Sequence, residues 1–111
     1  MITVKTGSDL ILLCRFAPGE GSPTSIDGYV INAAVQTSDG LRHMADTINP
    51  ATLPNVGWVM RFNAQNTKGW AGGKNAEDEK ALAHWDAKLF KDGIYSHTAT
   101  GDLIVLKSIT P

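Results

Sequence analysis

Two stretches in which apolar and polar residues alternate limit what this chain can fold into. The apolar members of the first stretch are Tyr29, Ile31, Ala33 and Val35. Those of the second stretch are Val56, Trp58, Met60 and Phe62. A period of two residues places every second side chain on the same face of an extended chain. The pattern therefore predicts two β-strands, each with one face in a core and one wetter face.

Turn-forming residues divide the rest of the chain into segments of strand length. Proline and glycine are frequent in 18–23, Ser38-Asp39-Gly40 is typical of a hairpin turn, and Asn49-Pro50 marks a further boundary. A closing apolar segment runs over 100–106. This spacing predicts an all-β fold, a single antiparallel β-sandwich over residues 1–111. A domain of this length buries about two-thirds of its unfolded surface.

Residues 75–90 contradict an all-β interpretation when they are taken alone. The acidic segment Glu77-Asp78-Glu79 precedes apolar residues at Leu82, Trp85 and Leu89. Acidic residues in a first turn and an apolar period of three or four favour a helix. Propensity is a weak guide that tertiary packing overrides. The residues alone therefore favour a helix here, and a strand is the alternative.

Short landmarks along the chain occur in an order that is typical of one group of proteins. They are Gly7-Ser8-Asp9 before an apolar run, Ile26-Asp27-Gly28-Tyr29, Gly57-Trp58, Thr67 with Trp70, Trp85-Asp86, and Thr100-Gly101-Asp102-Leu103-Ile104-Val105. In this order they resemble small bacteriophage and prophage virion proteins with an immunoglobulin-like or baseplate-upper-protein-like β-sandwich domain. The resemblance covers most of the chain. It implies an immunoglobulin-like fold and a structural role in the virion.

The resemblance also changes the expectation for 75–90, because it implies that Trp85-Asp86 lies in a strand. We therefore predict a short helical turn near 76–81, at about Glu77 to Lys80. A strand from about Leu82 to Phe90 is expected to follow it.

Charge and composition argue against several classes of partner. The chain carries 10 basic and 11 acidic residues, so its charge does not steer it toward nucleic acid or an anionic membrane. No run approaches the roughly 20 apolar residues of a membrane span. The single cysteine, Cys14, lies in the apolar run 10–16 and is expected to be a small buried side chain. We predict neither a nucleic-acid nor a membrane partner.

The residues that catalysis or metal binding requires do not form a recognisable set. His84 and Asp86 share a face on a strand, while His43 and His97 lie elsewhere. No spacing typical of zinc ligands occurs. The glycines of 69–74 resemble part of a phosphate-binding loop, but no Ser or Thr follows its lysine. We predict no cofactor, no metal and no enzymatic activity, and keep a hydrolase or metal enzyme that uses His84 and Asp86 as the least favoured alternative.

Trp70 is the tryptophan that we expect at the surface. Trp58 has the same parity as Met60 and Phe62 and is expected in the core, whereas Trp70 follows the polar segment 66–69. An exposed aromatic ring suits either a subunit contact or the apolar face of a sugar.

The leading prediction is a virion structural protein that binds copies of itself and other virion proteins in the tail, baseplate or fibre-attachment region. The expected contact surfaces are the loops Phe16 to Ile26 and Asn63 to Lys80 and the N-terminal strand Ile2 to Thr6. The predicted partner-binding residues are Ile2, Val4, Lys68, Trp70 and Lys74. The alternatives are a head decoration protein and a module that binds host glycans. For glycan binding, the predicted residues are Trp70, Asn63 and Asn66.

Overall fold

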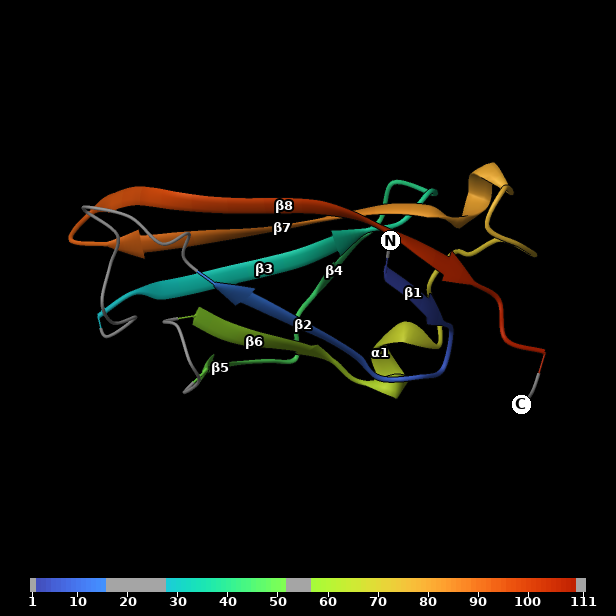
Figure 1. Cartoon of the computed structure of the whole chain (residues 1–111), viewed down its shortest axis with the longest axis horizontal. Coiled ribbons are helices and arrows are strands. Elements are labelled where there is room, and N and C mark those ends of the chain that lie inside the picture. The colour runs from blue at the N-terminus through green and yellow to red at the C-terminus, as the bar shows by residue number, and fades with distance from the viewer. Residues whose placement is uncertain (1, 16–27, 52–56, 110–111) are drawn as a thin grey trace.

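Two facing β-sheets make up the computed structural model, which describes residues 2–15, 28–51 and 57–109 (Figure 1). Within these residues, the larger sheet has the strand order β1 (Ile2–Lys5), β8 (Ile94–Leu106), β7 (Leu82–Lys91), β3 (Val30–Gln36) and β4 (Arg42–Met44). The smaller sheet has the order β2 (Leu10–Arg15), β6 (Gly57–Phe62) and β5 (Thr47–Ala51). A short helix, α1 (Ala64–Thr67), and a 3-10 helix, η1 (Glu79–Ala81), lie between β6 and β7. The predicted all-β sandwich is confirmed.

The strand order is that of an immunoglobulin-like sandwich. In that fold one sheet contains strands A, B, E and D, and the other contains C, F and G. Here β2, β6 and β5 take the places of B, E and D, and β3, β7 and β8 take those of C, F and G, with β4 added beside β3. The first strand, β1, lies in the larger sheet beside β8 instead of beside β2. One pairing differs from the antiparallel prediction, because β1 runs parallel to β8, with Ile2 opposite Leu103 and Lys5 opposite Leu106. The larger sheet is therefore mixed.

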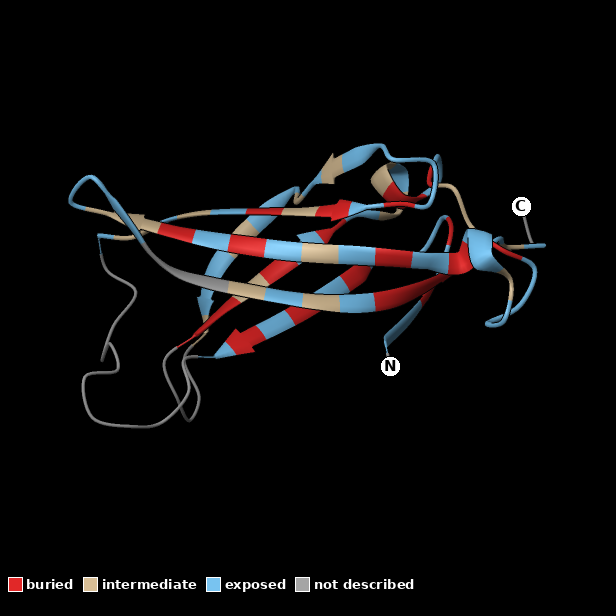
Figure 2. Ribbon diagram, turned by 90° about the horizontal axis from the view of Figure 1, so that it is seen from above, coloured by how far each residue is buried: buried red, intermediate tan, exposed pale blue. Residues whose placement is uncertain are grey.

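Alternate side chains of the strands meet between the two sheets. Figure 2 shows this as bands of buried and exposed residues along each strand. The inward residues include Leu10, Leu12 and Cys14 on β2, Ala33 and Val35 on β3, and Trp58, Met60 and Phe62 on β6. The predicted alternation is confirmed on β3 and, for Trp58, Met60 and Phe62, on β6, and so is the predicted burial of Cys14. Val56, the first residue of the predicted second stretch, lies outside the described residues.

The segment that is ambiguous in sequence forms a short helical turn and then a strand. Asp78 caps η1 by accepting a hydrogen bond from the backbone N–H of Lys80. β7 follows and pairs with β8 through a turn at Asp92 and Gly93, which both have positive φ. An Asp-Gly pair with positive φ at both positions matches the twist of a two-residue hairpin. The helical turn predicted near 76–81 and the strand predicted after it are both confirmed.

Trp70 closes one end of the sandwich and is 0% exposed. Its indole packs against the rings of Phe62 and His43, with ring centroids 5.6 and 5.1 Å away. Its Nε1–H donates a 3.0 Å hydrogen bond to Oδ1 of Asn66, and its carbonyl accepts one of 2.9 Å from Nζ of Lys107. The predicted exposure of Trp70 is therefore wrong. The physical reason is that α1 turns the preceding polar segment back over the end of the core.

Candidate functional site

Two edge strands meet on one flank of the sandwich. β1 ends the larger sheet and β2 ends the smaller one, and a turn that contains Gly7, with φ +82°, joins them. The buried hydroxyl of Thr67 fixes this turn, since it donates to the carbonyl of Ser8 at 2.7 Å and accepts from the N–H of Gly7 at 3.0 Å. Among the described residues, neither strand pairs with a second strand on its other side. Within that part of the chain, the flank presents two open sheet edges.

Large apolar side chains are exposed along these edges. Ile2 on β1 is 44% exposed, and Ile11 and Leu13 on β2 are 52% and 50% exposed. Ile11 and Leu13 point to the outer face of the smaller sheet, because the residues that alternate with them are buried. The half-buried Val59 of β6 lies directly opposite Leu13. The exposed Arg61 lies opposite Ile11, so the apolar surface is a narrow strip along β2 that Val59 extends at one point.

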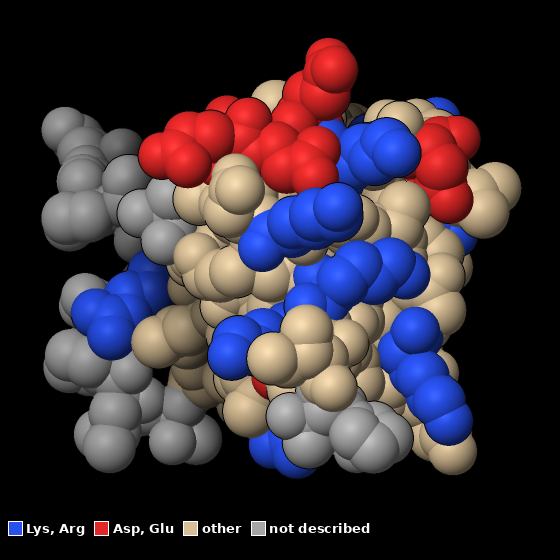
Figure 3. All heavy atoms as spheres, turned by 90° about the vertical axis from the view of Figure 1, so that its right-hand side faces the viewer, with Lys and Arg blue, Asp and Glu red and all other residues tan. Residues whose placement is uncertain are grey.

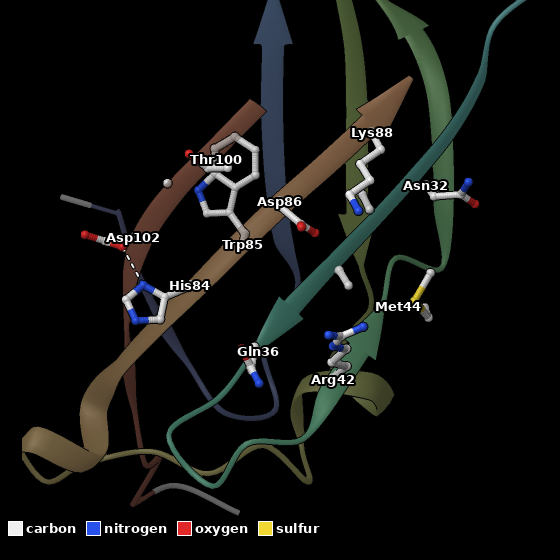
Figure 4. Close-up of a pocket in the computed structure, with 13 residues that line it drawn as sticks. Asn32, Gln36, Arg42, Met44, His84, Trp85, Asp86, Lys88, Thr100 and Asp102 are labelled. Carbon is white, nitrogen blue, oxygen red and sulfur yellow. Dashed lines mark hydrogen bonds and ion pairs between the residues drawn. The ribbon is translucent and has the colours of Figure 1, made fainter. Parts of the chain in front are cut away.

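The outer face of the larger sheet is polar and hollowed. Its side chains surround a depression of about 630 Å³ (Figure 4). Polar residues that line it include Asn32, Asp86, Lys88 and Thr100. The strand registers also place a row of polar side chains across the sheet, in the order Asp102, His84, Gln36 and Arg42. Because the row begins with a carboxylate and ends with a guanidinium, the face carries both signs of charge.

His84 pairs with Asp102 on this face, and not with Asp86. Nδ1 of His84 lies 2.6 Å from Oδ1 of Asp102, across the β7–β8 pair (Figure 4). Both side chains are more than half exposed, and exposed pairs of this kind contribute only about 0–1 kcal/mol. The two-residue turn at 92–93 sets which residues of β7 and β8 lie opposite each other, so the Asp-Gly pair is the feature of the sequence that could have predicted this pairing. The bulge at Leu89/Phe90 then shifts the register by one residue, which brings His84 opposite Asp102. Within the described residues, no three His, Cys, Asp or Glu side chains gather as a metal site would require.

Apolar side chains continue the outer face of the larger sheet toward the β7–β8 turn. Val30 lies opposite Phe90, and Phe90 lies opposite Tyr95. The rings of Phe90 and Tyr95 are 4.9 Å apart between centroids, and Tyr95 is 60% exposed. The exposed Lys88 is two residues before Phe90 on the same strand. This end of the face therefore combines an aromatic surface with polar neighbours.

The residues predicted to bind partner subunits differ in their exposure. Ile2, Lys68 and Lys74 are exposed. In Figure 3, lysine and arginine side chains spread over the end of the sandwich, and acidic side chains gather along one border. Val4 belongs to the core instead, and it is the one buried residue of β1. The contact loop predicted at Phe16 to Ile26 lies outside the described residues.

The residues predicted to bind glycans do not form a platform around Trp70. The backbone N–H of Asn63 donates to Oδ2 of Asp46 at 2.6 Å. The amide of Asn66 donates to the carbonyl of Met44 at 2.8 Å and to Asp46 at 3.2 Å, while its oxygen accepts from the indole of Trp70. These bonds tie α1 to the connection between β4 and β5. With the indole buried, the predicted sugar-stacking role of Trp70 is wrong.

Two further groups that carry potential chemistry have structural surroundings. Nε2 of His43 lies 3.1 Å from Oγ1 of Thr37, and partial burial lowers the pKa of His43 below its ordinary value, against a smaller opposing effect of Asp39. Burial raises the pKa of the Cys14 thiol to about 11. A thiol with so high a pKa is almost entirely protonated at neutral pH and is a poor nucleophile.

No protein-family model matches this chain, and a comparison with curated proteins finds no match either. In the described part of the chain, no helix has the length and apolar character needed to cross a membrane.

Proposed function

We propose that the chain is a structural protein of a bacteriophage particle that binds neighbouring subunits through the flank formed by β1 and β2. The observation that carries the proposal is the exposure of Ile2, Ile11 and Leu13 along two open sheet edges. The order of sequence landmarks, which resembles that of phage virion sandwich proteins, supports the particle as the setting. The tail, baseplate or fibre-attachment region is the proposed location, and head decoration is the alternative location.

The flank suits association with protein because it combines two sources of binding energy. An open edge offers backbone N–H and C=O groups to an extended segment of a neighbour, which adds to the sheet as a further strand. The apolar side chains beside the edge add about 25 cal/mol for each Å² that the contact removes from water. The scaffold behind the edge is already fixed by the core and by Thr67, so binding requires little ordering of this chain.

The test is quantitative mass spectrometry of purified particles from a phage or induced prophage that encodes the chain. We expect many copies per particle. A folded variant with Ile2→Lys and Ile11→Lys should be incorporated less than the wild type. Leu41→Lys, at a residue in the β3–β4 turn that is 58% exposed, should be incorporated normally. Absence of the wild-type chain from intact particles contradicts the proposed function.

The outer face of the larger sheet favours a second function, the binding of host glycans. Sugar rings stack on exposed aromatic side chains while their hydroxyls bond to polar neighbours. Tyr95 and Phe90 supply the aromatic surface here, and Lys88 and Asn32 supply polar groups beside the depression. Binding of the purified chain to a glycan array that is lost in Tyr95→Ala and kept in Leu41→Ala supports this function. A chain that binds no glycan on the array contradicts it.

A further inference from the structure

The open edge of β2 has fewer of the features that usually keep sheet edges from pairing with other chains than the other edges have. Native edges are protected by shortness, by charged side chains or by proline. Among the described strands, β4 is three residues long and carries Arg42, β5 contains Pro50, and β1 is four residues long and carries Lys5. β2 is six residues long, has no proline, and carries its one charged side chain at its last residue, Arg15, so its other five residues are uncharged. This edge is therefore the least protected of the four.

The outward residues of β2 are complementary to themselves in one antiparallel register. They are Ile11, Leu13 and Arg15 of β2, together with Asp9, which directly precedes the strand, and all four are exposed. If two copies run antiparallel with Leu12 opposite Leu12, then Ile11 of each copy lies opposite Leu13 of the other. In the same register, Asp9 of each copy lies opposite Arg15 of the other. Directly opposite residues point to the same side of a sheet, so apolar meets apolar and acid meets base.

Other registers lose this match. A shift by one residue turns the outward set of one copy toward the core side of the other. A shift by two places Ile11 opposite Ile11, or Leu13 opposite Leu13, and separates both Asp9 and Arg15 from an oppositely charged partner. In the register centred on Leu12, Asp9 keeps its present role. Its Oδ1 accepts the N–H of Ala64 at 2.7 Å, and a carboxylate has a second oxygen for a guanidinium.

We propose that two copies of this chain pair through β2, antiparallel and centred on Leu12, and join their three-stranded sheets into one continuous sheet. The two-fold axis is perpendicular to the sheet, so the contact is closed and uses the same surface on both copies. It brings the exposed Ile11 and Leu13 of both copies into one apolar cluster. The inference rests on the proposed function, because it names a second copy as the partner of one of the two open edges.

The first experiment measures the mass of the purified full chain by sedimentation velocity over a range of concentrations. We expect a species of twice the 11.9 kDa chain mass. Leu13→Lys places a charge in the apolar cluster and should raise the dimer dissociation constant about tenfold or more. Val30→Lys, at a residue that is 56% exposed on the outer face of the other sheet, is the matched control and should leave the mass unchanged. A monomer at all concentrations, an equal effect of both variants, or open-ended aggregates in place of a dimer each overturn the proposal.

The second experiment tests the register by disulfide cross-linking in a Cys14→Ala background, so that only introduced thiols react. Opposite residues in an antiparallel pair have Cβ atoms about 4.5–5.5 Å apart, close to the distance that a disulfide spans. A tagged Ile11→Cys chain mixed with an untagged Leu13→Cys chain should form the mixed disulfide, and each variant alone should not cross-link. Efficient cross-linking of Ile11→Cys to itself overturns the register. Failure of the mixed pair, when both chains are folded, overturns it as well.

Charge reversal supplies an independent check. Arg15→Glu should weaken the dimer, since it places two acids opposite each other at both ends of the contact. Adding Asp9→Lys should restore it, with folding confirmed by circular dichroism because Asp9 also bonds to α1. A double variant that is folded and weaker than Arg15→Glu contradicts the pairing. These outcomes are separable from those of the proposed function: a monomer that is abundant in particles refutes the dimer alone, and a dimer that is absent from particles refutes the virion role alone.

Discussion

Replacement of Trp70 by alanine is expected to be one of the most destabilising single changes in this chain. The residue is 0% exposed, and its ring contacts those of Phe62 and His43. Truncation of a buried aromatic side chain to alanine costs about 3–5 kcal/mol in transfer and cavity terms. With an m-value of about 2 kcal/mol/M in urea, that loss lowers the unfolding midpoint by about 1.5–2.5 M. The total stability of a domain this size is about 5–15 kcal/mol, so the variant retains only part of it.

A second substitution at the same position separates packing from hydrogen bonding. Trp70→Phe keeps most of the apolar volume but removes the Nε1–H donor, whose acceptor is Oδ1 of Asn66 at 3.0 Å. Loss of that bond and imperfect packing should cost about 1–2 kcal/mol. Leu41→Ala is the control, because its side chain is exposed in a turn and should change stability by less than about 0.5 kcal/mol.

The assay is urea unfolding of each variant, monitored by circular dichroism. The midpoints are compared among variants that have the same m-value. Acrylamide quenching of the folded proteins tests the burial directly. Since Trp58 and Trp85 also fluoresce, the signal of Trp70 is the difference between the wild type and Trp70→Phe, and we expect it to resist quenching. If Trp70→Ala unfolds within about 0.5 kcal/mol of the wild type, or if the difference signal is quenched as in an exposed indole, the reasoning about this end of the sandwich is refuted.

Three further predictions concern single groups in the core and its border. A Cβ at Gly101 would overlap the indole of Trp85, so Gly101→Ala should lower the free energy of unfolding by about 1–3 kcal/mol, as measured by thermal unfolding. Gly69→Ala is the control and should show no such loss, because no atom lies within 4 Å of the added carbon. The pKa of His43 is lowered from 6.5, so the unfolded chain binds more protons at this group below that pH. The contribution of His43 to the free energy of unfolding should be constant above pH 6.5 and fall as the pH drops below it, and His43→Gln should flatten this part of the pH dependence in urea titrations. The thiol of Cys14, with a pKa of about 11, should react slowly with a disulfide reagent at pH 8 in the folded chain and rapidly in the chain unfolded by urea. Equal rates in the two states would show that folding does not shield the thiol from the reagent.

The alternation of residues is sufficient to predict the strands whose two faces differ in polarity. On β3, Ala33 and Val35 face the core while Asn32 and Gln36 face outward, so the sequence itself carries the period of two. The segment that becomes β7 is harder, because its acidic start and apolar spacing also fit a helix. Its strand form follows from packing, which buries Ala83, Ala87 and Leu89 on one side of the sheet. Small alanine side chains carry little hydrophobic signal, so the period is weak in the sequence.

The candidate surfaces were less accessible to prediction because they depend on contacts between distant segments. Trp70 follows a polar stretch and yet is buried, since α1 places it against Phe62 and His43 from other parts of the chain. The pairing of His84 with Asp102 requires the hairpin register and its bulge. Neither fact can be read from spacing alone.

The sequence of β2 does not reveal which of its residues face the core, because residues 10–14 are all apolar. In the structure, the outward residues of this strand are apolar and exposed. In the middle of the outer face of β3 and β7, polar residues such as Asn32, Gln36 and Asp86 occupy outward positions, and the exposed apolar residues Val30 and Leu82 lie at strand ends. At the corresponding positions of β2 stand Ile11 and Leu13, which gain little from a fold that leaves them half exposed. Those side chains lower the free energy only if another surface covers them, and an uncovered edge of this kind promotes aggregation. We therefore expect the edge of β2 to be covered in the functional state of the chain, where Ile11 and Leu13 are removed from water. The charges at the two ends of the segment, on Asp9 and Arg15, then favour the antiparallel register centred on Leu12 over the alternatives.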